Sequence, residues 1–151
     1  GNDWDFTRVN SMARWLGKAT CSSGNQDEFD RLVRRRLEAG ESMTMPVTGQ
    51  PEGRSPIGAH HMTGNVAEWC SDWYDPLYYF KATGAFGETN RNPTGPETGT
   101  ERTWRGGSWA RDLARSRAGT IVNLLRAPYR QSSTPDSRSY FIGFRLVQEL
   151  E

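Results

Sequence analysis

Residues 64–75, GNVAEWCSDWYD, place two tryptophans, a tyrosine, three acidic residues and a cysteine within one short stretch. A glycine-asparagine pair opens the stretch and is a typical turn signal. The apolar residues follow neither a helical period nor a strict alternation, so the pattern predicts an irregular loop. Such a density of aromatic and acidic side chains is unusual for a loop that only connects two elements.

The composition of the chain predicts one small domain with a lean core. Its 151 residues suit a single domain, but only 34% of them are hydrophobic. Six Trp, six Phe and five Tyr can supply the core, since each aromatic ring removes roughly 150 to 250 Å² from water when buried. Sixteen Gly and eight Pro predict many turns and little regular secondary structure.

The charge balance favours neither a nucleic-acid partner nor an anionic membrane surface. Basic residues number 19 and acidic residues 18, so no excess charge would attract a polyanion. No apolar run approaches the roughly 20 residues of a membrane span, and no charged-then-apolar leader is visible. Because the chain begins with Gly1 rather than Met, we expect the true N-terminus, with any targeting signal, to lie outside it.

The two cysteines, Cys21 and Cys70, lack the CxxC spacing of a metal knuckle or a redox pair. A disulfide between them and two separate buried thiols are equally compatible with the sequence. The compartment therefore stays open.

One helix is predicted over residues 27–40, DEFDRLVRRRLEAG. Its apolar residues recur at helical spacing, acidic residues occupy the first turn, and Gly40 provides a stop signal. We interpret its arginines as a solvated face. Residues 45–56 and 81–101 predict long polar loops, while residues 102–109 and 141–147 predict short strands, the second alternating at Ile142, Phe144 and Leu146.

Three stretches in register resemble the formylglycine-generating-enzyme, or sulfatase-modifying-factor, family. They are GAHHMTGNVAEWCSDWYDP (58–76), NPTGPETGTERTWRGGSW (92–109) and IGFRLV (142–147). The resemblance implies an α+β fold like that of the C-type lectins, with short twisted antiparallel strands, long loops and few helices. It also implies that residues 1–151 are the C-terminal part of one such domain, whose front half lies outside this chain.

The resemblance also implies a calcium site in the opening stretch. Carried over residue by residue, it assigns the carbonyls of Gly64 and Val66 and the carboxylate of Glu68 as ligands, and places Asn10 in another calcium site. Oxygen ligands of this kind suit calcium. His61 stands where the family has an acid or amide, and imidazole is a poor ligand for a hard cation. The alternative is that Asn65 and Glu68 only satisfy backbone groups of the loop.

Copper-dependent catalysis is not expected. The family's catalytic members resemble one another in a GGS-aromatic-x-Cys-x4-Cys pattern whose thiolates bind copper(I), a soft metal. The same frame here is GGSWARDLARS, with Arg111 and Ser116 at the two cysteine positions. A guanidinium is always cationic and a serine hydroxyl is not a soft ligand.

Two classes of function remain open. We favour a non-catalytic binding or assembly module, with Trp69, Trp73, Trp104 and Trp109 forming the floor of the loop. The alternative is a copper-independent oxidative tailoring enzyme of the same family. The expected partner is the missing N-terminal half of the domain or another chain, and the resemblance favours an extracytoplasmic location.

Several C-terminal features bear on that choice. Arginines stud the last third of the chain and could line a cleft for a protein or small-molecule ligand, although hydrogen bonding to carbonyls is the interpretation we favour. The apolar run of Ile121, Val122, Leu124 and Leu125 either meets a neighbouring chain or is buried in the core. His60 and His61 are interpreted as structural rather than catalytic. The arginines of the last third of the chain that could line such a cleft are Arg105, Arg111, Arg115, Arg117, Arg126, Arg130 and Arg138.

Overall fold

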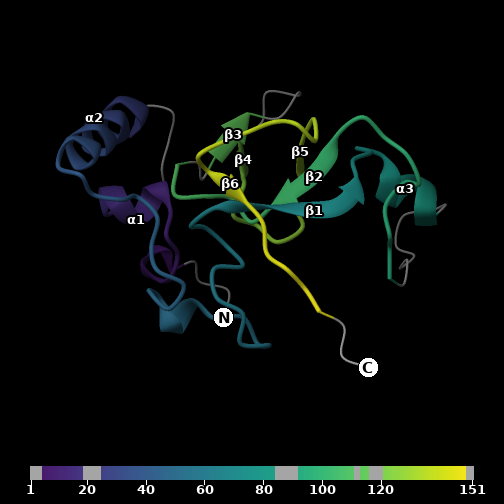
Figure 1. Cartoon of the computed structure of the whole chain (residues 1–151), viewed down its shortest axis with the longest axis horizontal. Helices are drawn as coiled ribbons and strands as arrows, with labels where there is room; N and C mark the ends of the chain where they lie inside the picture. Colours follow the sequence, from purple (N-terminus) through teal and green to yellow (C-terminus); the bar gives the residue numbers. More distant parts are fainter. Residues whose placement is uncertain (1–4, 19–24, 84–91, 111–112, 116–120, 149–151) are drawn as a thin grey trace.

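A twisted four-stranded sheet with the strand order β5-β2-β1-β6 lies at the centre of the molecule (Figure 1). The computed structural model describes residues 5–18, 25–83, 92–110, 113–115 and 121–148. A separate two-stranded sheet pairs β3 with β4. The strands are β1 (Ala67–Trp73), β2 (Arg102–Arg105), β3 (Leu113–Arg115), β4 (Ile121–Asn123), β5 (Gln131–Ser133) and β6 (Ile142–Gly143).

The helices are short except for one. Helices α1 and α2 lie together at one end of the sheet, and α3 lies at the opposite end of β1 (Figure 1). Few helices and long connections between short strands give the α+β class that the resemblance implies, with the little regular structure that the composition predicts. None of the helices in the described part of the chain is both long and apolar enough to cross a membrane. The helical elements are η1 (Phe6–Arg8), α1 (Met12–Leu16), α2 (Gln26–Glu38), η3 (Pro51–Gly53) and α3 (Tyr78–Thr83).

Strand β1 corrects the prediction of an irregular loop over residues 64–75. It pairs with β2 on one side and with β6 on the other. Residues on both faces of β1 are partly covered, so its sequence need not alternate between apolar and polar residues. Only Ala67 in β1 is fully buried, and most of the other residues are half-buried. A register shift between Trp69 and Trp73 further blurs the alternation.

Strand β6 differs from the expected antiparallel arrangement. The pairs β1·β2, β2·β5 and β3·β4 are antiparallel, whereas β6 runs parallel to β1. Its ladder is also shorter than the strand predicted over residues 141–147. Phe144 and Leu146 lie beyond the paired residues and are exposed, so the alternation in this stretch marks no buried face.

The predicted helix is confirmed as α2, and its apolar face packs against α1. Phe29 is buried, and Leu32 and Val33 are partly buried beside it. Gly40 follows the helix with a φ of +72°, a conformation that glycine adopts readily. Helix α1 was not predicted; the Ser11 hydroxyl accepts a hydrogen bond from the Arg14 amide at its start.

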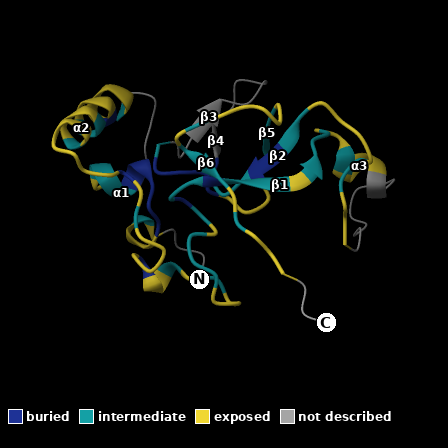
Figure 2. Cartoon of the chain, in the orientation of Figure 1, coloured by how far each residue is buried: buried dark blue, intermediate teal, exposed yellow. Residues whose placement is uncertain are grey.

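The main core lies between the helices and the sheet, where buried segments gather (Figure 2). Its buried members come from separate segments, namely Met12, Ala13, Phe29, Met43 and Trp109. Leu124 and Leu125 are also buried, which supports the core interpretation for that half of the apolar run. The Cys70 thiol is free and half-buried, and desolvation raises its pKa. Cys21 lies outside the described residues.

Candidate functional site

Asn65 joins three segments that are distant in sequence. Its Oδ1 accepts hydrogen bonds from the Met45 amide and from Asn10 Nδ2, each at 2.9 Å. Its backbone amide donates to the Asn10 carbonyl at 2.7 Å, and its carbonyl accepts from the Trp109 amide at 2.9 Å. The Asn65 side chain therefore satisfies backbone groups, although these belong to Met45 rather than to its own loop. We call this group of contacts the Asn65 junction.

Gly64 allows the junction to form because it lies directly against the N-terminal segment. A β-carbon at this position would lie 2.4 Å from Val9 Cγ1 and 2.6 Å from the Asn10 carbonyl oxygen. The backbone φ of +78° also disfavours any side chain. The structure therefore brings Gly64 and Asn10 together, as two of the residues proposed for calcium.

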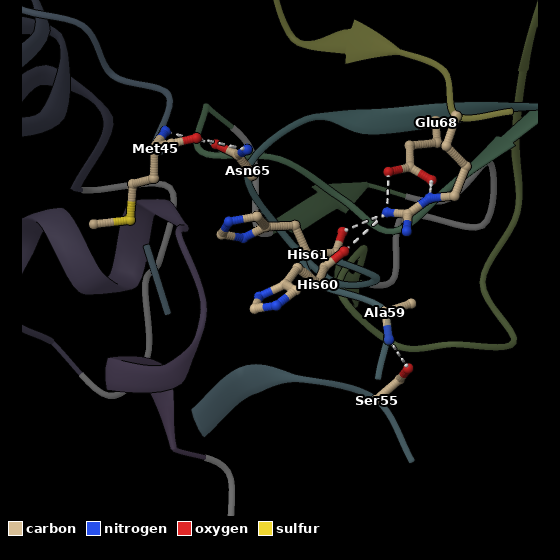
Figure 3. Close-up of polar contacts among 8 residues, drawn as sticks. Met45, Ser55, Ala59, His60, His61, Asn65 and Glu68 are labelled. Atoms are coloured by element: carbon tan, nitrogen blue, oxygen red, sulfur yellow. Dashed lines mark hydrogen bonds and ion pairs between the residues drawn. The ribbon is translucent and has the colours of Figure 1, made fainter. Parts of the chain in front are cut away.

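Glu68 faces Arg145 across the edge of the sheet. The Nε and Nη2 groups of Arg145 donate to the two carboxylate oxygens of Glu68, and Nη2 also donates to the carbonyls of His60 at 3.1 Å and His61 at 3.3 Å (Figure 3). The Glu68 and Arg145 side chains are 21% and 33% exposed, so this ion pair is only partly screened by water. The hydrogen bonds with the Glu68 carboxylate raise the pKa of Arg145 above its ordinary value.

This arrangement fits a guanidinium better than it fits calcium at Glu68. Both carboxylate oxygens are already hydrogen-bonded to Arg145, and a calcium ion would have to displace that side chain. The calcium role of Gly64, Val66 and Glu68 stays a prediction from the resemblance.

Asn10 presents a different environment. The residue is fully buried, and its Nδ2 donates to the Met43 carbonyl as well as to Asn65. Its Oδ1 is buried and has no hydrogen-bond partner within the described ranges. A buried carbonyl oxygen of this kind is usually satisfied by an ordered water or a cation. A calcium role for Asn10 therefore fits its surroundings and also stays a prediction.

The two histidines differ in what they contact. The His61 ring turns away from Glu68, and its Nε2 hydrogen-bonds the Pro46 carbonyl at 3.0 Å. His61 also has a φ of +52°, which is uncommon for a residue with a side chain. Both histidines offer carbonyl oxygens to Arg145. These contacts agree with a structural role.

The four tryptophans of the expected floor are placed on β1, on β2 and just after β2. Trp69 pairs with Trp104 across the β1·β2 ladder. Trp104 and Trp109 are buried, while Trp69 and Trp73 are half-buried. The four tryptophans therefore do not form one floor. Three lie on the sheet, whereas Trp109 packs in the helical core.

The described arginines of the C-terminal third mostly bind the chain itself. Arg105 donates to the Ala127 carbonyl at 2.9 Å and to the Tyr79 hydroxyl at 2.8 Å. Arg130 donates to the Asp75 carbonyl at 3.2 Å and stacks over the Tyr79 ring. These contacts agree with the favoured interpretation for both arginines. An Arg-lined ligand cleft stays a prediction.

A cavity of about 420 Å³ opens between α2 and the segment that follows β2. The sequence does not predict this cavity, because its lining residues come from four separate segments. We call it the Trp109 pocket. Its lining is mostly apolar, with acidic and amide groups at Asp30 and Gln26; the other lining residues include Phe29, Val33, Leu37, Met43, Trp109 and Tyr140.

The Trp109 pocket is lined by a residue that directly precedes the first of the family's two cysteine positions in the sequence. Ala110 lines the pocket, and Arg111 follows it directly in the chain. Arg111, Arg117 and Ser116 lie outside the described residues.

Comparison with known proteins gives a consistent family match. The profile of the Sulfatase-modifying factor enzyme 1-like domain matches residues 7–150. The formylglycine-generating enzyme of Streptomyces coelicolor is 37% identical over 115 residues, which cover 76% of this chain and 32% of that protein.

Two further relatives carry other names. The serine/threonine-protein kinase pkn1 of Chlamydia caviae is 30% identical over an alignment of 153 positions, which covers 93% of this chain and 22% of the kinase. The hercynine oxygenase of Mycolicibacterium thermoresistibile is 32% identical over 112 residues, covering 70% of this chain and 22% of that protein. This chain thus spans a third or less of the length of each of these relatives. It belongs to the sulfatase-modifying-factor family and has that family's C-type-lectin-like α+β fold.

Proposed function

We propose that this chain is a non-catalytic binding or assembly module that uses the family fold without copper chemistry. The observation that carries the proposal is the identity of the residues at the two cysteine positions, Arg111 and Ser116. Copper(I) needs soft thiolate ligands. A permanently charged guanidinium would repel the metal, and a hydroxyl is a hard and weak substitute.

The Trp109 pocket supplies a surface on which such a module could hold a ligand. Its volume of about 420 Å³ lies within the usual range for small-molecule sites. Phe29 and Trp109 pack against each other with ring centroids 6.2 Å apart, and Tyr140 stacks near Trp109 on the exposed side. An apolar group, or an aromatic side chain of a partner protein, would bury its surface against these rings.

The names of the relatives support a role that does not depend on one reaction. The same domain matches proteins named as a formylglycine-generating enzyme, a protein kinase and a hercynine oxygenase. A fold found with several activities is a scaffold onto which different sites have been built. The partner that this proposal expects is a front half of the domain that lies outside this chain, or another chain.

The second candidate is a copper-independent oxidative tailoring enzyme. It is favoured by the match to the hercynine oxygenase, which shares 32% identity with this chain. Incubating the chain with hercynine and iron(II) in air, followed by mass spectrometry, tests this candidate. Oxygen incorporation that requires the chain would replace the module proposal with the enzyme.

The copper part of the proposal is tested by measuring copper(I) retention under anaerobic conditions and the oxidation of a cysteine-containing peptide. We expect the chain to retain no copper and to leave the peptide unchanged. The double variant Arg111→Cys/Ser116→Cys should retain copper, whereas Arg111→Cys alone should retain less. Copper binding together with peptide oxidation by the natural chain would contradict the proposal.

The binding part is tested with an environment-sensitive hydrophobic dye. Leu37 lines the Trp109 pocket and is 60% exposed, while Val47 is 70% exposed and is not one of the pocket's lining residues. Leu37→Asp should weaken dye binding, and Val47→Asp should not. Equal dye binding by both variants and the natural chain would show that this pocket is not a ligand surface.

A further inference from the structure

Four oxygen atoms converge on the guanidinium of Arg145. Two belong to the Glu68 carboxylate, and the other two are the carbonyl oxygens of His60 and His61 (Figure 3). The oxygens come from the loop before β1 and from β1 itself, whereas Arg145 comes from the segment after β6. A single cation therefore holds the loop, β1 and the C-terminal segment together.

The donors of Arg145 suit these acceptors. A guanidinium is planar and presents its N–H groups as a fork, so Nε and Nη2 can engage both oxygens of one carboxylate. Nη2 also reaches the two carbonyl oxygens at 3.1 and 3.3 Å. With this set satisfied, the carboxylate of Glu68 needs no other cation to balance its charge.

The residue at position 61 supports the same conclusion. The resemblance places an oxygen ligand of calcium here, but this chain has His61, whose Nε2 is hydrogen-bonded to the Pro46 carbonyl at 3.0 Å. The ring is thus directed to another segment, and only the backbone oxygen of His61 faces Arg145. The loop has lost one side-chain oxygen, and the Glu68 carboxylate is occupied by Arg145.

We propose that Arg145 is the resident cation of the loop that contains His60, His61 and Glu68, and that it takes the place of the calcium ion predicted by the family resemblance. The loop then needs no metal to hold its shape. The inference concerns this loop alone; it does not depend on the proposed binding role, nor on whether Asn10 holds a metal elsewhere.

Calcium titration tests the inference on the intact chain. Melting temperatures are measured in excess calcium and in excess EDTA, for the natural chain and for Glu68→Gln. Any response to calcium should be the same in both proteins, because a metal at Asn10 would not depend on Glu68. A calcium-dependent rise in Tm that Glu68→Gln removes would overturn the inference.

A double-mutant cycle provides the second test, and it needs no metal. Arg145→Ala and Glu68→Gln should each lower Tm by roughly 3 to 8 °C, and the double variant should lose little more than the worse single variant. Arg138→Ala, at an exposed arginine of the same C-terminal stretch, should change Tm by less than about 2 °C. Additive losses, or an equal loss from Arg138→Ala, would overturn the inference. If Arg145→Ala does not fold, Arg145→Lys takes its place in the cycle, with the same criterion of non-additivity.

Discussion

Replacing Gly64 with alanine tests the contact between the opening motif and the N-terminal segment. The new β-carbon would lie 2.4 Å from Val9 Cγ1 and 2.6 Å from the Asn10 carbonyl oxygen. Holding a non-glycine residue at a φ of +78° costs about 1 to 2 kcal/mol. Overpacking costs about 1 to 3 kcal/mol more, so we expect a loss of about 2 to 5 kcal/mol in the free energy of unfolding.

Gly58→Ala is the matched control for this change. Gly58 has a φ of +82°, nearly the same as that of Gly64, but a β-carbon there would meet no atom of the described residues within 4 Å beyond its own chain neighbours. Gly58→Ala should therefore lower the free energy of unfolding only by the backbone cost of about 1 to 2 kcal/mol. The difference between the two variants measures the close approach of Val9 and Asn10 alone.

Urea denaturation followed by tryptophan fluorescence measures both losses. A loss of about 2 to 5 kcal/mol is a large part of the roughly 5 to 15 kcal/mol that stabilises a typical domain, and it corresponds to a fall in Tm of roughly 4 to 20 °C. Equal losses for Gly64→Ala and Gly58→Ala would refute the reasoning, because they would show that the N-terminal segment does not pack on the motif.

Two further predictions concern the helical core and the dependence of stability on pH in acid. Phe29→Ala should lower the free energy of unfolding, measured by urea denaturation, by about 3 to 5 kcal/mol, because the Phe29 ring is only 2% exposed. Leu37→Ala, at a residue that is 60% exposed, should lower it by less than about 1 kcal/mol. Similar losses for the two variants would contradict the assigned core. Hydrogen bonds from the Lys81 side chain and the Leu77 amide lower the pKa of Asp75 below 3.8, so Asp75 adds stability above its unfolded pKa and loses it as the pH falls through the folded pKa. As the pH falls below 3.8, the Tm of the natural chain should therefore fall more steeply than the Tm of Asp75→Asn, which has no carboxyl group at this position. Curves of Tm against pH that run parallel for the two proteins would contradict this assignment.

Local patterns in the sequence predicted the elements that are built from local interactions. Helix α2 was found because its apolar residues keep the helical period and face one neighbour, α1. Strand β1 was missed because its side chains are partly covered on both faces of the sheet. The period of a strand becomes visible only when one face is buried and the other is exposed.

The candidate site was predicted in part, for a similar reason. The resemblance brought Asn10, Gly64 and Glu68 to attention, and the structure places Asn10 and Gly64 in contact. The resemblance did not identify Arg145 as the partner of Glu68, because the two residues are 77 positions apart in the sequence.

The Asn65 junction has a consequence for how the molecule opens. The backbone and side chain of this one residue hold the N-terminal segment at Asn10, the connector at Met45 and the segment after β2 at Trp109. Because all three links meet at one residue, we expect them to break together rather than one at a time. Amide protons of the Asn65 and Trp109 backbones should therefore exchange with solvent in one common event, so that the helices and the sheet behave as a single cooperative unit.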